Sequence, residues 1–439
     1  MNARKPLHRD QPNCILVLQG GGALGAYHIG AYKALAEHDL HPAWVCGISI
    51  GAFNAAVIAG NPREARVKRL DEMWESISWP SVFPPSSNAE LHWWQNSLSF
   101  AEGLWFGQPN FFRPWPFNPW LVPDGQYAVS FYDTAPMADT LKQFTDFERI
   151  NGGATRLSLG VTEIACGELK FFNNFAERRP IEPKDFMKNV RMQPEHVLAS
   201  GSLPPGFPPI EIGEESYWDG GCISNTPLEA VLRDPPEGHT VAFVIDLWNG
   251  RGEVPANMKE VLWREKQIQY ASRIATHVDA VATKFELARK NAMLKAATAQ
   301  LAKGAAGSKA RIEGASAKDV AAAIPDEICI GPDARIDIVH IIYQPTPDQT
   351  PWSDAEFSRA SIAQRRKAGY DDMLAALAQK PWLAPKGPHE CALVHCVENG
   401  RVVTRTPGAH RTRGERADRP PAATSAGPKG GKLAAAVRS

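Results

Sequence analysis

Cysteine, net charge and long apolar runs are all scarce in this sequence. Its 439 residues include seven scattered cysteines, an odd number that does not fit the disulfide framework of a small secreted protein. The 48 basic and 48 acidic residues cancel, so bulk charge does not indicate specific nucleic-acid binding. The first apolar run is too short for a signal peptide, and none reaches the roughly 18 residues of a membrane-spanning helix. We therefore expect a cytoplasmic, reduced protein whose membrane contact is at most peripheral.

What is present is enough apolar material for a large core, since 44% of the residues are hydrophobic and 22% are charged. Short apolar runs, typical of buried strands, alternate with segments of helical spacing. This order predicts an α/β fold with a mostly parallel central sheet. The predicted strands are residues 14–19, 44–46, 156–164, 241–247 and 336–343, and the first predicted helices are 26–38 and 50–59.

Composition changes along the chain suggest its organisation. Seven of the 13 tryptophans fall within residues 73–120, where prolines also recur, so we expect an irregular aromatic insertion there. Between residues 401 and 439, nine Lys or Arg face two acidic residues, which indicates a solvated tail rather than one bound to anionic lipid or nucleic acid. The predicted parts are a polar arm at 1–12, a main α/β domain at 13–250, a helical C-terminal extension at 251–384 and a disordered basic tail at 385–439.

The C-terminal extension is predicted to be largely helical. Residues 258–303 indicate one long helix, followed by a flexible linker at 304–314. A capping box at Ser353–Glu356 is expected to open a last helix that runs to about Gln379. The long helix has one apolar stripe, which we expect to pack on the same chain. A dimer seam is the alternative, so a homo-oligomer is allowed but not indicated. The stripe consists of Ile274, Val278, Val281, Phe285 and Ala288.

Three glycine-containing motifs suggest chemistry, and each is weak when taken alone. The first, Gly-Gly-Gly-Ala-Leu-Gly at residues 20–25, directly follows the first predicted strand. The second is G-x-S-x-G at residues 47–51, between the second predicted strand and its helix. The third is Asp-Gly-Gly at residues 219–221. Their context has to decide what they do.

Ser49 is the candidate nucleophile. A sharp strand-to-helix turn puts the residue at its apex in a strained conformation with an exposed side chain. Gly47 and Gly51, two residues to either side, would let strand and helix pack closely around it. The N-terminus of the helix favours developing negative charge at this position. The competing interpretation is a serine that only caps the helix.

The glycine loop at residues 20–25 has two interpretations. Gly20, Gly22 and Gly25 satisfy the dinucleotide pattern G-x-G-x-x-G, and Asp39 lies near the acidic position expected for it. Alternatively, glycine amides can approach the oxygen of a tetrahedral intermediate closely and form an oxyanion hole. A candidate nucleophile one strand–helix unit later favours the oxyanion hole.

Asp219 is the candidate base. Asp-Gly-Gly on its own is an ordinary tight turn. Here it follows a run of glycines and prolines at residues 201–209, which would hold a loop rigid, and a positioned carboxylate needs such support.

Histidine is the alternative base. His340 alternates with Ile338 and Ile342 in a predicted strand, which indicates a core histidine rather than a member of a catalytic triad. His28 and His196 are the other candidates. A final cluster could bind metal but matches no common zinc spacing, so the sequence predicts no metal and no cofactor. That cluster is His389, Cys391, His395 and Cys396.

In this order the three motifs resemble those of the patatin-like phospholipase family, in its bacterial branch with a C-terminal domain of unknown function. The motifs cover residues 14 to about 228, and residues 263–272, 336–343 and 357–370 resemble that C-terminal domain. The resemblance implies a three-layer α/β/α sandwich and a Ser–Asp dyad without histidine. Leu24 departs from the pattern, because many members carry Arg or Lys in this loop.

Carried over to this chain, the resemblance makes Ser49 the nucleophile and Asp219 the base. Asp219 accepts the serine proton, the serine attacks an ester carbonyl, backbone amides hold the oxyanion, and water then releases the acyl group. The implied oxyanion-hole residues are Gly20, Gly21, Gly22, Gly25 and Ile50, and the supporting glycines are Gly47, Gly51, Gly220 and Gly221.

The implied substrate is a lipid ester, as for a phospholipase A or a lysophospholipase. The alternatives are another ester, such as a neutral lipid or an intracellular polyester, a scaffold without turnover, and a dinucleotide-binding protein. The aromatic insertion either packs onto the body or forms a lid or acyl-binding wall. The residues expected in such a wall are Trp93, Trp94, Trp105, Phe111 and Phe112.

On this interpretation, Asp219→Asn abolishes ester hydrolysis in a protein that stays folded, because an amide cannot accept the serine proton. His340→Ala retains most of the activity. Steady-state hydrolysis of a soluble ester measures both, with circular dichroism as the folding control. Loss of turnover in a folded His340 variant would reverse the assignment.

Overall fold

The computed structural model describes most of the chain. No helix of the described residues is long and apolar enough to cross a membrane. All of them belong to one compact unit that ends at Pro407, and the predicted boundary at residue 250 falls inside it. The described residues are 12–79, 89–125, 127–175, 185–234, 238–271, 274–303, 311–312, 315–316, 335–345, 350–384, 392–398 and 400–405.

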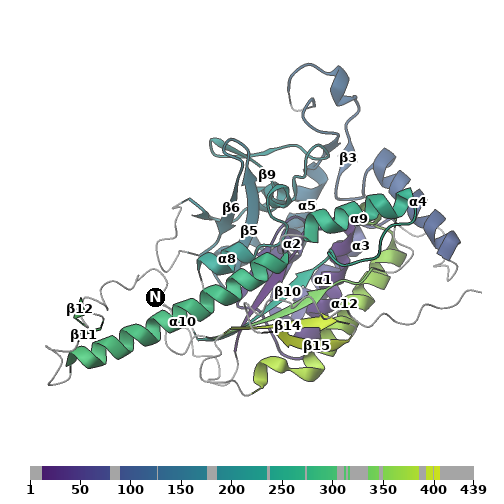
Figure 1. Ribbon diagram of the computed structural model, residues 1–439. Coiled ribbons are helices and arrows are strands. Elements are labelled where there is room, and N and C mark those ends of the chain that lie inside the picture. The colour runs from purple at the N-terminus through teal and green to yellow at the C-terminus, as the bar shows by residue number, and fades with distance from the viewer. Residues whose placement is uncertain are drawn as a thin grey trace, which may run out of the picture. The chain divides into compact units, whose positions relative to one another are not determined.

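Within these residues an 11-stranded, mostly parallel sheet forms the centre (Figure 1). Its order is β15-β14-β13-β10-β1-β2-β5-β6-β7, with β9 paired to β5 and β8 paired to β9. The strands from β14 to β5 are parallel. Strand β6 is antiparallel to β5 and parallel to β7, whereas β9 and β15 run antiparallel to their partners. The strands are β1 (Asn13–Leu18), β2 (Trp44–Gly47), β5 (Arg156–Glu163), β6 (Glu168–Asn173), β7 (Met187–Asn189), β8 (Ile210–Ile212), β9 (Glu215–Asp219), β10 (His239–Asp246), β13 (Arg335–Ile342), β14 (Ala392–Glu398) and β15 (Arg401–Arg405).

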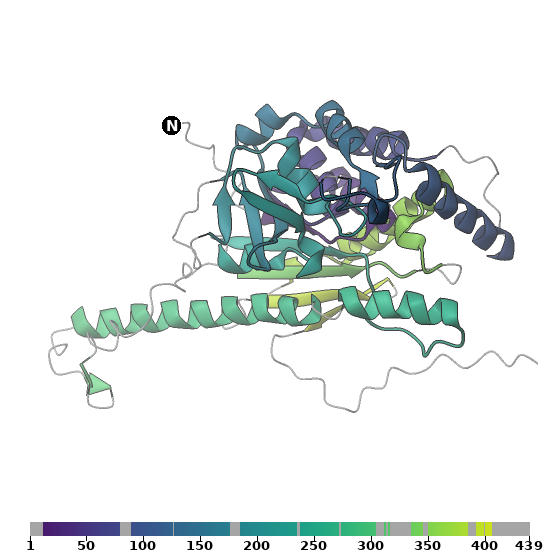
Figure 2. The same cartoon turned by 90° about the horizontal axis from the view of Figure 1, so that it is seen from above.

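Helices flank the sheet and complete the predicted α/β architecture. Helix α10 packs on β13, β14 and α8, and Figure 2 shows it on the opposite side of the sheet from α1 and α12. Two short pairs lie outside the sheet, β3 (Arg113–Pro114) with β4 (Tyr132–Asp133) and β11 (Arg311–Ile312) with β12 (Ala315–Ser316). The helices are α1 (Ala26–Glu37), α2 (Ile50–Gly60), α3 (Arg66–Ser76), α4 (Ala89–Phe106), α5 (Ala135–Phe144), α6 (Phe147–Asn151), α7 (Pro194–Gly201), α8 (Leu228–Arg233), α9 (Met258–Ala271), α10 (Ile274–Lys303) and α12 (Arg359–Gln379).

The central strands form where the sequence predicts them, because their apolar runs fill the core on both faces of the sheet. Five of the six residues of β1 are buried, and so are seven of the eight residues of β10. Both neighbours of β1 pair with it in parallel, as strand–helix–strand order requires.

The aromatic insertion is more regular than predicted. Helix α4 occupies 18 of its residues. The prolines on which the prediction of irregular structure rested lie on either side of this helix and none lies within it. Among its other described residues, 73–76 are the end of α3, and short pieces follow α4, namely β3 and the 3₁₀ turn Pro119–Leu121.

The C-terminal elements differ from the prediction in two details. The expected long helix forms as α9 and α10, and α10 packs on the same chain, although of the stripe only Ala288 has a described side chain, which is buried. The predicted capping box is wrong. Ser353 lies in a 3₁₀ turn, η6 (Ser353–Ala355), and Ser358 caps α12 by accepting a hydrogen bond from the Ser361 amide at 3.3 Å. Helix α12 ends at Gln379, as predicted.

The predicted disordered tail starts too early. Residues 392–398 form β14, which pairs in parallel with β13, and β15 folds back on it. The prolines and glycines around this stretch led to the prediction of disorder. The run Ala392–Val397 is nevertheless buried, since all six of its residues lie in the interior. Residues 1–11, most of the predicted linker, and residues 406–439 lie outside the described residues.

Truncation tests whether the tail begins after Ala384, as the sequence predicts, or after Pro407, where the compact unit ends. A chain that ends at Ala384 lacks β14 and exposes the edge of β13, so we expect aggregation or a melting temperature lower by about 10 °C or more, since several apolar side chains lose their burial. A chain that ends at Pro407 should melt within about 2 °C of the full chain. Differential scanning fluorimetry of the two truncations measures this, and equal melting temperatures would contradict it.

Candidate active site

Ser49 lies at the apex of the turn between β2 and α2. Its backbone has φ of 55°, a conformation that non-glycine residues rarely adopt. Its side chain makes no capping hydrogen bond to α2, so the capping interpretation does not hold. Close backbone packing encloses the turn: a Cβ atom on Gly51 would lie 2.3 Å from the Leu18 carbonyl oxygen, and one on Gly47 would lie 2.4 Å from the Gly51 carbonyl oxygen.

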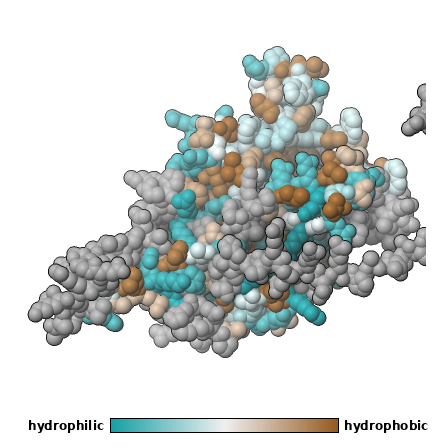
Figure 3. Space-filling model, viewed as in Figure 1, coloured by the Kyte–Doolittle hydropathy of each residue, from teal (hydrophilic) through white to brown (hydrophobic). Residues whose placement is uncertain are grey.

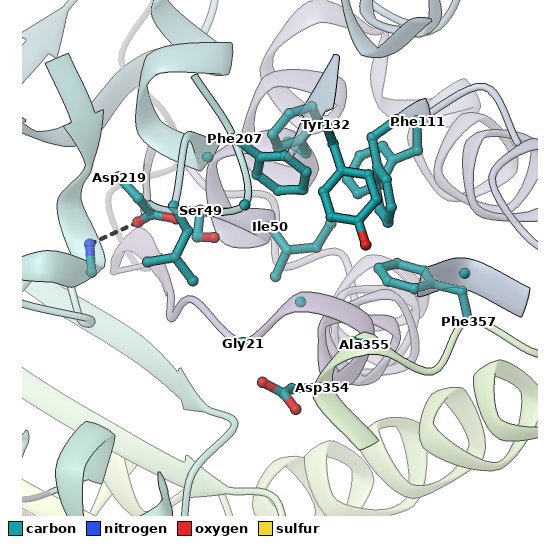
Figure 4. Close-up of a pocket in the computed structure, with 18 of the residues that line it drawn as sticks. Gly21, Ser49, Ile50, Phe111, Tyr132, Phe207, Asp219, Asp354, Ala355 and Phe357 are labelled. Carbon is teal, nitrogen blue, oxygen red and sulfur yellow. Dashed lines mark hydrogen bonds between the residues drawn. The ribbon is translucent and has the colours of Figure 1, made fainter. Parts of the chain in front are cut away.

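Asp219 ends β9 and is 1% exposed. Its backbone amide donates to the Ser202 carbonyl at 2.9 Å, and its Oδ1 accepts a hydrogen bond from the Gly221 amide at 2.7 Å. Burial raises the pKa of Asp219 to about 7, although hydrogen bonds from Ser49 and from the Gly221 amide oppose the shift. The sheet brings the hydroxyl and the carboxylate together, and Figure 4 shows them side by side.

The two side chains line a cavity of about 370 Å³, a volume within the range of small-molecule sites. Gly21, Gly22 and Ile50 line it beside Ser49. Within the described part of the chain, the amides of these three residues donate to no protein acceptor, since Ile50 begins α2 and the two glycines begin the 3₁₀ turn η1 (Gly22–Gly25). They can therefore receive an anionic oxygen.

The other two predicted oxyanion glycines lie elsewhere. The Gly20 amide already donates to the Asn225 carbonyl at 3.0 Å, and Gly20 does not line the cavity. Gly25 packs against the side chain of Ile50, where its missing Cβ allows close contact. The structure thus narrows the candidate donors to Gly21, Gly22 and Ile50.

Sequence reasoning missed the residues that hold the glycine loop. The Gly20 carbonyl accepts two hydrogen bonds, from Asn225 Nδ2 at 2.9 Å and from Trp248 Nε1 at 3.0 Å. Asn225 lies six residues after Asp219, on the same turn, and this proximity was the one signal that could have found it. Gly220 and Gly221 support that turn, and a Cβ atom on Gly220 would lie 2.6 Å from the Gly160 carbonyl oxygen.

The cavity wall is aromatic, but it uses only part of the predicted set. Phe111 and Phe112 line the cavity, whereas Trp94 and Trp105 are 61% and 73% exposed. The side chain of Trp93 lies outside the described residues. Helix α4 instead contributes its inner face to the wall, through Phe100, Gly103 and Leu104.

The C-terminal region also contributes to the cavity wall. Tyr270 from α9 and Phe357, just before α12, line it, together with Asp354 and Ala355 (Figure 4). Lys266 Nζ holds the carboxylate of Asp354, at 2.8 and 2.9 Å from its two oxygens.

No histidine is among the described residues that line the cavity. His340 is buried against Asp246, which confirms it as a core histidine with a satisfied ring, and the Asp246 carboxylate raises the pKa of His340 to about 10 against the opposing effect of burial. Burial lowers the pKa of His28 to about 3. The ring of His196 accepts from the Gln193 amide in the cap of α7.

The described part of the chain contains no group of three or more His, Cys, Asp or Glu residues arranged to hold a metal ion. Of the predicted metal cluster, His395 hydrogen bonds with Asp337 at 2.7 Å and with Thr404 at 2.9 Å. His389 and Cys391 lie outside the described residues.

Several known proteins are similar in sequence to part of this chain. The triacylglycerol lipase SDP1L of Arabidopsis thaliana is 46% identical over 64 residues, 15% of this chain and 8% of the relative. Patatin-like phospholipase domain-containing protein 6 of Homo sapiens is 43% identical over 70 residues, 16% of this chain and 5% of the relative. Lysophospholipase NTE1 of Kluyveromyces lactis is 24% identical over 255 residues, 56% of this chain and 13% of the relative. This chain therefore spans only a small part of the length of these relatives.

The solved structure of VipD from Legionella pneumophila matches 84% of this chain and 67% of its own, at 16% identity and a TM-score of 0.32. A sequence model described as patatin-like phospholipase matches residues 16–232. A second, described as patatin phospholipase, matches residues 268–389. With both parts present in this order, the chain belongs to the patatin-like phospholipase family, in the branch that carries this C-terminal domain.

Proposed function

We propose that this protein is a serine acyl hydrolase that cleaves lipid esters with a Ser49–Asp219 dyad. One observation carries the proposal: a strained, cavity-facing serine hydroxyl touches a buried carboxylate of raised pKa, beside three amides that have no acceptor among the described residues. A carboxylate with an ordinary pKa near 3.9 is a poor base for a hydroxyl, and burial brings Asp219 into the range that proton transfer at neutral pH needs.

In the first half-reaction, Asp219 takes the proton of Ser49 as the serine oxygen bonds to the ester carbonyl carbon. The amides of Gly21, Gly22 and Ile50 stabilise the oxyanion of the tetrahedral intermediate. The carbon–oxygen bond to the alcohol then breaks, and the proton passes from Asp219 to the leaving alkoxide. Water enters, gives its proton to Asp219 and releases the acyl group as a carboxylic acid by the same steps, so Ser49 regains its hydrogen.

The cavity suits an acyl chain better than a phosphate. Its wall is largely aromatic and aliphatic, and its charged side chains among the described residues are the carboxylates of Asp219 and Asp354. A buried phosphate would find no cationic side chain there, which disfavours the dinucleotide alternative and leaves a phospholipid headgroup outside the cavity. The relatives include a triacylglycerol lipase and a lysophospholipase, which fits either a neutral lipid ester or a phospholipid ester as the substrate.

We also propose that the protein contacts a lipid surface peripherally, through exposed aromatic side chains. Trp94, Leu98 and Trp105 form an exposed stripe on α4, spaced four and seven residues apart, and the inner face of α4 lines the cavity. Figure 3 shows further hydrophobic side chains on the lobe after β3, where Phe117 and Trp120 are 60% and 83% exposed. Tryptophan favours the membrane–water boundary, and α4, which carries the stripe, also lines the cavity.

Active-site labelling tests the dyad. A fluorophosphonate probe should label the wild type at Ser49, and Ser49→Ala should abolish both labelling and ester hydrolysis. Asp219→Asn should lower kcat by at least about 1000-fold, because the base is lost. Asp39→Asn is the matched control, since Asp39 is exposed and its φ of 56° accepts asparagine. Hydrolysis by Ser49→Ala at the wild-type rate would refute the proposal.

The pH profile tests the base. Because Asp219 must be ionised to accept the proton, kcat/KM should rise with pH and level off above an apparent pKa of about 7, falling roughly tenfold per pH unit below it. An ester that does not itself ionise, assayed from pH 5 to 9, measures the profile. A level profile from pH 5.5 to 8.5 would contradict a raised pKa.

A further inference from the structure

Arg365, on the cavity side of α12, is a charged side chain with 1% exposure. Its Nη1 donates to the Ala23 carbonyl at 3.1 Å and to the Glu356 carbonyl at 2.9 Å, and its Nη2 donates to the Ser353 carbonyl at 2.9 Å. The carboxylate of Glu356, also buried, is 3.7 Å away. One guanidinium thus ties a carbonyl of the glycine loop to two carbonyls of the segment 353–356.

The glycine loop is consequently held at both ends. The Gly20 carbonyl accepts from Asn225 and Trp248, and the Ala23 carbonyl accepts from Arg365. Between these two anchors lie Gly21 and Gly22, whose amides are candidate oxyanion donors. Fixing the carbonyls on either side restricts rotation of the peptide groups between them, and oxyanion stabilisation depends on donors that are oriented before the reaction.

The segment that Arg365 holds also supports the loop directly. A Cβ atom on Gly22 would lie 2.1 Å from the Asp354 carbonyl oxygen, so the two backbones are in direct contact. Ala355, within that segment, and Phe357, directly after it, line the cavity.

Helix α12, which carries Arg365, is also in close backbone contact with α1, the helix that follows the glycine loop. Glycines make this contact possible. A Cβ atom on Gly30 would lie 1.8 Å from the Arg366 carbonyl oxygen, and one on Gly369 would lie 2.0 Å from the Tyr27 carbonyl oxygen. The phenol of Tyr27 donates to Asp372 at 2.7 Å. The distance from α12 to the loop is therefore fixed by backbone contact between the two helices.

We infer that Arg365 is a positioning residue for the oxyanion loop, through which the C-terminal region completes the active site. The inference rests on the proposed hydrolase function for its catalytic consequence. Arg365 touches no reacting atom. It acts by holding the Ala23 carbonyl and the segment 353–356 in place.

A double variant separates positioning from stability. Arg365→Met alone leaves Glu356 buried without a counter-charge and is expected to unfold readily. Arg365→Met with Glu356→Gln removes both charges, and the glutamine keeps the oxygen that accepts from the Ser358 amide at 2.7 Å in the native chain. The matched control is Arg366→Met with Asp71→Asn, which removes the partly exposed ion pair of 2.8 Å between the next residue of α12 and a carboxylate of α3.

We expect the Arg365/Glu356 double variant to stay folded, to lose at least about tenfold in kcat with KM within about twofold, and to label more slowly with fluorophosphonate. Hydrogen exchange at residues 20–25, followed by mass spectrometry, should become faster, while the control double variant stays within twofold of the wild type in all readouts. A folded double variant with kcat within twofold of the wild type overturns the inference.

The exchange measurement keeps this test separate from the proposed function. If the wild type hydrolyses no ester and Ser49 takes no label, the hydrolase proposal fails. Unchanged exchange at residues 20–25 in the double variant then refutes the anchoring itself, whatever the reaction.

Discussion

The turn from β2 into α2 is the constraint on which the site depends. A backbone with φ of 55° at Ser49 is unfavourable, and it persists because the surrounding backbone leaves no alternative. Gly51 contacts the Leu18 carbonyl, and the Ser49 amide donates to the Ser200 carbonyl at 2.9 Å. The same sheet order then places the carboxylate: β2 pairs with β5, and β5 pairs with β9, which ends at Asp219.

The position of Asp219 is what makes the proposed two-residue site chemically sufficient. A carboxylate normally needs an intermediary such as histidine to act as a base toward a hydroxyl near neutral pH. Here removal from water, at 1% exposure, makes the charged form costly and raises its proton affinity, and only the Ser49 hydroxyl and the Gly221 amide offset this. The apolar wall to which the proposal assigns the acyl chain also excludes the water that would restore an ordinary pKa. In the proposed function, substrate fit and basicity therefore have the same physical origin.

The parts of the fold that sequence could predict are those determined locally. The glycines two residues from Ser49 and the apolar run of β1 can each be recognised in a stretch of ten residues. The anchors of the glycine loop are not: Asn225 lies 205 residues from Gly20, and Arg365 lies 342 residues from Ala23. The sequence around an asparagine or an arginine does not indicate which distant residue its side chain will contact. Strand β14 was missed for a related reason, since its pairing with β13 outweighs the helix- and strand-breaking residues that precede it.

The C-terminal region is part of the same body as the motifs. Strand β10 lies between the two matched regions and pairs with β1 of the first and, along eight residues, with β13 of the second, so the sheet joins the two regions without a break. Both matched regions also line the cavity. Ser49 and Phe111 come from the first region, and Tyr270 and Phe357 come from the second. A catalytic half folded alone would leave one edge of β10 unpaired, one wall of the cavity missing and the Ala23 carbonyl without Arg365. In the proposed function, the requirement for a rigid oxyanion loop thus couples catalysis to the folding of a region that contains none of the three motifs.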